Sequence, residues 1–172
     1  MDRSEWLNRL EALHDQVRRG EPVSAEAMEW YRGARKALLE TAVTVQAQAL
    51  IGSAVQRSSI RITRSAQVLL EARGWGHQTL TADLGTGGFA AFLEAPPPVT
   101  EWIKATLVLP GEGAVVATVA VADVKTVTGL VRVAFRFSEP SADVQRRVEN
   151  YMVDSLLEQL VFWDDVLEHL RY

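Results

Sequence analysis

The spacing of hydrophobic residues changes twice along this 172-residue chain. Up to about residue 54, apolar positions recur every three or four residues, as between Trp6 and Val17, which predicts amphipathic helices. Gly20 follows two arginines, as at a helix C-terminus, and Ser24 is a suitable N-cap for a second helix. We therefore expect two helices joined by a short connector and lying antiparallel as a hairpin.

The middle of the chain follows a period of two instead. The stretch VRVAFRF, Val131–Phe137, places apolar residues on one face and Arg132 and Arg136 on the other. Ile103–Leu109 and Ala114–Val124 are also typical of strands, and the turn residues PGEG lie between them. About six strands with regular turn signals predict a small antiparallel barrel or sandwich.

From Ser141 onward the helical spacing returns and predicts one helix of about 30 residues. Its second half offers more apolar surface than a lone helix can leave exposed. We expect this surface to mediate self-association, as a homodimer or a higher oligomer, or else to pack on the N-terminal helices in one bundle. The predicted organisation is α+β, with a helical hairpin over 1–54, a barrel over 55–140 and a helix over 141–172.

Composition and charge narrow the classes of function. The net charge is −4, which argues against a DNA- or RNA-binding protein. The sequence has no cysteine and no apolar run near the roughly 20 residues of a membrane span, so we expect a cytoplasmic protein without membrane insertion. Arg57, Arg61, Arg64 and Arg73 nevertheless cluster in sequence. The cluster favours a small anionic partner, or is a group of solvated surface arginines.

No constellation of residues has the parts of an active site. The GTGG stretch lacks the lysine of a phosphate-binding P-loop. Asp165 and His169 have the i,i+4 spacing of metal ligands, but no third ligand lies near them in sequence. We therefore expect no catalytic residues, no metal and no cofactor, and a protein that is not an enzyme.

Two short motifs carry a resemblance to a known family. RSSIR, Arg57–Arg61, is an RxxxR pair just before the first predicted strand, and DLGTGG, Asp83–Gly88, lies at the end of the next strand. This layout, from about residue 55 to 153, resembles the PilZ domain family, whose signature is RxxxR followed by D/NxSxxG. The resemblance implies a six-stranded antiparallel PilZ-type β-barrel, and members of the family commonly act as receptors for the second messenger cyclic di-GMP.

The resemblance also implies a role for each motif residue. Arg57 and Arg61 would hold the phosphates and a guanine, because a guanidinium binds phosphate, pairs with guanine and stacks on bases. Asp83 would accept hydrogen bonds from a guanine, and Gly88 would let the backbone approach the ligand. The alternatives are solvated arginines, an aspartate that caps loop amides, and a hairpin turn made of Gly87 and Gly88.

The chain departs from the signature at Gly85, where the family has serine. Loss of one hydrogen bond to a polar or charged ligand group costs about 1.5–3 kcal/mol, roughly a tenfold to hundredfold loss of affinity. Two functions therefore stay open. The first is a cyclic di-GMP receptor that passes the signal to an unknown protein partner or to its own helices. The second is a degenerate PilZ protein that acts as an interaction module in motility, pilus or polysaccharide regulation; a barrel unrelated to PilZ is a third reading.

Overall fold

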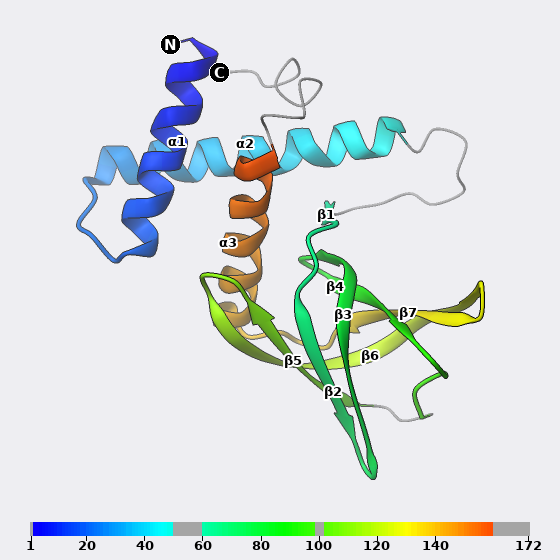
Figure 1. Cartoon of the computed structure of the whole chain (residues 1–172). Helices are drawn as coiled ribbons and strands as arrows, with labels where there is room; N and C mark the ends of the chain where they lie inside the picture. The colour runs from blue at the N-terminus through cyan, green and yellow to red at the C-terminus, as the bar shows by residue number, and fades with distance from the viewer. Residues whose placement is uncertain (1, 50–59, 99–101, 160–172) are drawn as a thin grey trace. The chain divides into compact units, whose positions relative to one another are not determined.

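The computed structural model describes residues 2–49, 60–98 and 102–159. It contains three helices and seven strands (Figure 1). The helices are α1 (Arg3–Arg18), α2 (Ala25–Ala49) and α3 (Ala142–Gln159). The strands are β1 (Arg61–Ile62), β2 (Gln67–Ala72), β3 (Trp75–Gly85), β4 (Gly88–Leu93), β5 (Ile103–Leu109), β6 (Gly113–Val127) and β7 (Leu130–Phe137). Arg57, the metal-spaced pair Asp165 and His169, and the predicted helix after residue 159 lie outside the described residues.

Strands β2 to β7 close into an antiparallel barrel. Their order around the sheet is β3, β2, β5, β6, β7 and β4, and β4 pairs again with β3 to close the ring. This confirms the predicted six-stranded barrel and the α+β class. The short strand β1 was not predicted from the sequence pattern. It pairs Arg61 with Gly85 and Ile62 with Leu84 of β3, so Arg61 lies within the sheet rather than before it.

Alternation along the strands fills the barrel with apolar side chains. In β7 the four residues of the predicted apolar face, from Val131 to Phe137, are buried, and β5 buries Ile103 and every second residue after it. Phe89 of β4 stacks on Phe135 of β7 with 5.0 Å between the ring centroids. Burying a side chain of this size stabilises a fold by roughly 1.5–3 kcal/mol, so the inward faces define the strand register.

A buried threonine bridges the break between β1 and β2. The backbone N–H of Ala66 donates to Thr81 Oγ1 at 2.9 Å, and the N–H of Thr81 donates to the Ala66 carbonyl at 2.8 Å. Strand β3 therefore stays continuous over eleven residues while its partner is split into β1 and β2. The break leaves the two residues of β1 paired with the end of β3, beside the glycine loop.

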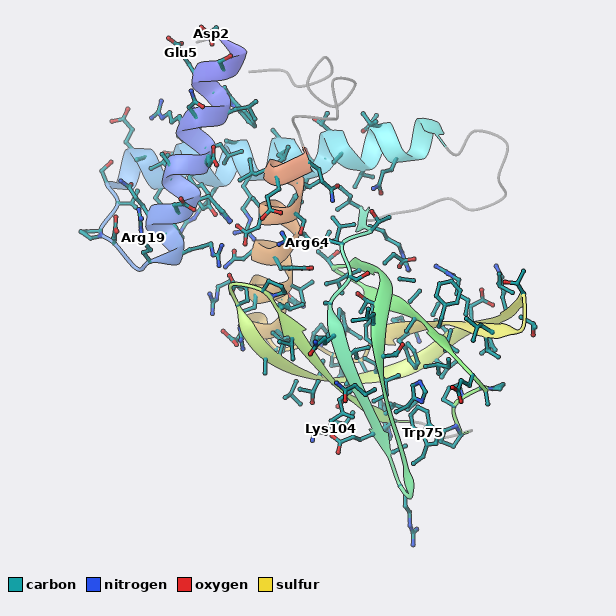
Figure 2. The ribbon with its side chains drawn as sticks, in the orientation of Figure 1. Asp2, Glu5, Arg19, Arg64, Trp75 and Lys104 are labelled. Atoms are coloured by element: carbon teal, nitrogen blue, oxygen red, sulfur yellow. The ribbon has the colours of Figure 1, made fainter. Side chains whose placement is uncertain are left out.

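Helix α3 packs on the barrel through contacts with two loops. Ser141 caps its start, accepting a hydrogen bond from the Val144 N–H at 3.3 Å. Arg147 donates to the carbonyl of Glu112 in the β5–β6 turn. Tyr151 is buried, and Figure 2 shows Arg64, from the segment between β1 and β2, beside the helix.

The N-terminal helices are capped as the sequence predicts but arranged differently. Ser24 Oγ accepts a hydrogen bond from the N–H of Ala27 at the start of α2. Trp6 of α1 contacts Trp30 of α2 edge to face with 6.1 Å between ring centroids, and His14 lies 2.7 Å from the hydroxyl of Tyr31. Residues eight positions apart on α1 thus meet adjacent residues of α2.

Helix α1 therefore crosses α2 and does not run antiparallel beside it (Figure 1). The six-residue connector between the helices is longer than the loops of a tight helical hairpin, which allows the crossing.

Residues 61–155 form one compact unit, and the described residues before them belong to a second unit together with the last turn of α3. None of the described helices is long and apolar enough to cross a membrane. The barrel unit contains both motifs of the predicted site, apart from Arg57.

Candidate functional site

The two sequence motifs meet at an ion pair on the outer face of the barrel. Arg61 Nη1 of β1 donates a hydrogen bond to Asp83 Oδ1 of β3, across 22 residues of sequence. The register explains the contact: Arg61 lies opposite Gly85, and Asp83 precedes Gly85 by two residues on the same face. Diagonal neighbours of this kind are within reach of a long side chain.

A second arginine binds the other oxygen of the same carboxylate. Arg132 Nη2 of β7 donates to Asp83 Oδ2 at 2.6 Å. Asp83 pairs with Ala90 of β4, which pairs with Ala134 of β7, two residues from Arg132. Because alanine is small, the Arg132 side chain can cross β4 to reach Asp83.

Asp83 is therefore held between two guanidinium groups with little contact to water. The side chain of Asp83 is 15% exposed, and those of Arg61 and Arg132 are 29% and 28% exposed. Hydrogen bonds between charged partners are roughly twice as strong as neutral ones. The cluster of these three residues, called the ion triad below, carries one net positive charge and can exchange partners with an anion.

The glycine loop is a two-residue hairpin, displaced by one residue from its expected position. Gly85 and Gly88 pair with each other, so the loop consists of Thr86 and Gly87. Gly88 is the first residue of β4, and the alternative of a turn made of Gly87 and Gly88 is wrong in this respect. The Gly87 carbonyl accepts a hydrogen bond from the N–H of Phe137 at 3.0 Å, which ties the loop to β7.

Gly88 packs against the backbone of β7 without room for a side chain. Its φ is +150°, and a Cβ atom there would lie 2.0 Å from the Phe135 carbonyl oxygen and 2.9 Å from Arg136 Cα. The close approach expected of this glycine is therefore made to β7 within the barrel. Its approach to a ligand stays a prediction.

Gly85 lies buried between the backbones of two strands. It pairs with Arg61 on one side and with Gly88 on the other. Opposed residues in an antiparallel pair place their Cβ atoms about 4.5–5.5 Å apart. A serine at this position, as in the family signature, would therefore stand next to the stem of Arg61.

The remaining predicted residues divide into three cases. Arg57 lies outside the described residues. Arg73 is exposed, as expected for a solvated arginine. Arg64 is half-buried, with its guanidinium carbon 5.4 Å from the ring centroid of Tyr151, so the alternative of a solvated surface arginine is wrong for this residue. Both carboxylate oxygens of Asp83 bond to arginines, so it is not a simple cap of loop amides.

Sequence reasoning missed Arg132 as a member of the site. The alternation of β7 places it on the outer face, which was the one available signal. Asp83 and Arg132 are 49 residues apart in sequence. They become neighbours only through the order of the strands in the barrel, which the sequence pattern does not give.

Further cations surround the triad on the outer face. Arg136 lies two residues from Ala134 on the same face of β7, and Lys125 of β6 pairs with Arg132. Partly exposed arginines beside a mostly buried carboxylate suit a ligand that carries both anionic groups and N–H donors. Among the residues that the structure describes, no three histidine, aspartate or glutamate side chains gather as a metal site would require.

Comparison with known proteins gives a family model and several related structures. The model, described as PilZ domain, matches residues 55–154. The Bacillus subtilis inhibitor of motility MotI/DgrA is 17% identical with a TM-score of 0.54, covering 61% of this chain and 53% of its own. YcgR from Escherichia coli, solved in complex with c-di-GMP, is 18% identical with a TM-score of 0.55, covering 64% and 50%.

The apo structure of MrkH from K. pneumonia is also similar, at 20% identity and a TM-score of 0.53, covering 62% of this chain and 54% of its own. The chain thus spans about half the length of these proteins. At these identities the likeness shows the fold. No curated protein sequence gave a significant match.

Proposed function

Because the chain belongs to the PilZ domain family, we propose that it is a cytoplasmic receptor for cyclic di-GMP, not an enzyme. In this proposal, ligand binding at the ion triad changes how the barrel engages its helices or a partner protein. The observation that carries the proposal is the contact between Arg61 and Asp83. It joins the two halves of the family signature at one place on the barrel.

The chemistry of the ligand matches the triad. Cyclic di-GMP carries two phosphates and two guanines. The guanidinium groups of Arg61 and Arg132 supply paired donors for phosphate oxygens or for the O6 and N7 edge of guanine, and flat surfaces for stacking. Asp83 is an acceptor for guanine N1–H and N2–H. Arg57, four residues before Arg61, would complete the set from the preceding segment.

Binding would proceed by exchange of partners within the triad. A phosphate oxygen takes the place of the Asp83 carboxylate on one or both arginines, and the freed carboxylate accepts hydrogen bonds from guanine. The arginines pair with Asp83 before the exchange and with phosphate after it. The triad of the free protein therefore does not carry an unpaired buried charge that waits for the ligand. The exchange would shift Arg61 and with it the short strand β1.

The chain offers a route from this strand to helix α3. Three residues after Arg61, the guanidinium group of Arg64 lies over the ring of Tyr151 at cation–π distance, and the Tyr151 hydroxyl donates to the Ser65 carbonyl at 3.5 Å. Movement of β1 would disturb both contacts and change the balance between two positions of the helix. Helix α3 would then carry the signal towards a protein partner or the helices of the chain itself.

A second function is favoured by Gly85. Glycine presents no hydroxyl to a ligand, and the triad pairs its own charges when no ligand is present. Both observations fit a degenerate PilZ protein that no longer binds the messenger. It would act as an interaction or oligomerisation module through its helices, in motility, pilus or polysaccharide regulation by family analogy.

Isothermal titration with cyclic di-GMP separates the two functions. The native protein is compared with Arg61→Ala and with Arg73→Ala, which removes an exposed arginine from the tip of the β2–β3 hairpin as the matched control. Micromolar or tighter binding that only Arg61→Ala abolishes supports the receptor. Absence of heat from the native protein at millimolar ligand rejects it in favour of the second function.

A further inference from the structure

Each half of strand β6 pairs with a different strand, and Val119 alone pairs on both edges. Residues 113–119 pair with β5 on one side, and residues 119–127 pair with β7 on the other. Between Ala120 and Val127, the described part of the chain places no strand on the side that β5 occupies earlier. Figure 1 shows the resulting β6–β7 hairpin projecting from the barrel, coloured yellow at its tip.

The turn of this hairpin indicates which backbone groups point outward. Thr128 and Gly129 have φ values of +46° and +85° and form a two-residue loop between the paired residues Val127 and Leu130. Positive φ at both loop residues is typical of a type I′ turn. The residues that close such a hairpin exchange hydrogen bonds with each other.

Hydrogen-bonded and non-bonded pairs then alternate along the hairpin. Val127, Lys125 and Asp123 thus direct their N–H and C=O groups to β7. Those of Thr126 and Val124 point to the open edge.

The same segment exposes apolar side chains. Four of these side chains are between 37% and 43% exposed, namely those of Val121, Val124, Val127 and Leu130. An open strand edge with exposed β-branched residues is a template for pairing with another strand, and proteins normally protect such edges. Here the protecting charges are those of Asp123 and Lys125 on the outer face of the hairpin. Lys125 Nζ lies 3.1 Å from Asp123 Oδ2.

We propose that this edge binds the same edge of a second copy of the chain, antiparallel about a twofold axis at Val124. In that register Asp123 of each copy lies opposite Lys125 of the other, and Val121 lies opposite Val127. If the antiparallel register shifts by two residues in either direction, aspartate lies opposite aspartate or lysine opposite lysine. Parallel pairing in register also places like charges opposite each other. Opposed like charges destabilise a strand pair, so the charge pattern selects one register and one partner.

The interface is small, and the expected dimer is weak. Pairing shifts register between Val121 and Asp123, so β6 bulges at Ala122 and bends away from a straight edge. The ordered contact therefore centres on Val124 and its two neighbours, Asp123 and Lys125. An interface of this size belongs with transient associations, and we expect a dissociation constant on the order of 100 μM. The proposal does not rest on cyclic di-GMP binding, although Lys125 lies opposite Arg132 of the ion triad.

Sedimentation velocity of the full chain, from about ten to several hundred micromolar, tests the proposal. We expect a reversible monomer–dimer equilibrium. Asp123→Lys or Lys125→Asp alone should weaken it at least tenfold, because each opposes like charges twice in the dimer. The double variant with both charges reversed restores every opposite-charge pair and should restore the dimer.

A backbone variant provides an independent test. Val124→Pro removes an N–H group that points to the open edge and makes no hydrogen bond to β7. Proline is tolerated at such edge positions. It should abolish the dimer while circular dichroism shows a native melting transition. A native protein that stays monomeric throughout the range overturns the proposal. Self-association that survives both single charge reversals also overturns it, because it then uses another surface such as the helices.

Discussion

Gly85 lies directly opposite Arg61 in the register of β3 and β1. The position where this chain departs from the family signature is thus the position that faces the signature's second arginine. Arg61 passes this residue to reach Asp83, two residues earlier on β3. The departure therefore acts at the centre of the candidate site rather than at its rim.

Gly85→Ser is expected to raise the affinity for cyclic di-GMP tenfold to hundredfold, which corresponds to about 1.5–3 kcal/mol for one hydrogen bond to a polar or charged group. The matched control is Gly85→Ala, which adds the Cβ atom without the hydroxyl and should give no gain. Isothermal titration of the three proteins measures the effect. Equal affinities for the serine and alanine variants would show that the hydroxyl contributes nothing here.

Arg132→Ala is expected to weaken cyclic di-GMP binding by at least tenfold, because it removes one of the two guanidinium groups on the triad. Arg146→Ala is the control, since Arg146 is an exposed arginine that pairs with Asp143 on α3. Isothermal titration of both variants and of the native protein with cyclic di-GMP measures the three affinities. If both bind like the native protein, Arg132 holds Asp83 in the free state only and is no part of the ligand site.

Gly88→Ala is expected to destabilise the barrel by about 3 kcal/mol or more, because a methyl group would overlap the Phe135 carbonyl and strain the backbone. Gly87→Ala is the control, one residue away, where a Cβ atom would meet nothing within 4 Å. Urea unfolding followed by fluorescence measures both. A loss below about 1 kcal/mol for Gly88→Ala would mean that β4 and β7 separate easily at this point.

Thr81→Val is expected to lower the free energy of unfolding by about 1–3 kcal/mol, because it leaves the buried N–H of Ala66 without its acceptor. Thr79→Val, on the same strand, removes a hydroxyl that donates to the Phe92 carbonyl at an exposed position and should cost much less. Chemical denaturation of both variants gives the comparison. Equal losses would contradict the role of Thr81 in bridging β1 and β2.

The strands and their buried faces could be predicted because alternation records which side of a sheet each residue occupies. The stretch Val131–Phe137 predicts both β7 and its inward residues. Alternation does not record which strands are neighbours. The pairing of Asp83 with Arg132 depends on β4 lying between β3 and β7, and that order follows from closure of the whole barrel.

The sequence pattern also failed to predict strand β1 and the crossing of α1 over α2. The two residues of β1 are too few to show a period, so Arg61 was expected before the sheet. Ser24 marks the start of α2, but the crossing of α1 over α2 depends on large side chains such as Trp6 and Trp30 that meet across the pair. The chemistry of the site could be predicted from residue types, and its geometry required the fold.

The most direct test of the central claim, that cyclic di-GMP binds at the ion triad, is an amide NMR titration of the isotope-labelled protein. The glycine signals report on the site because Gly85 and Gly88 flank the loop and Gly74 lies far off in the β2–β3 turn. We predict saturable shifts of the Gly85 and Gly88 signals and an unchanged Gly74 signal. Absence of any shift at millimolar ligand, or shifts that spare Gly85 and Gly88, would contradict the account.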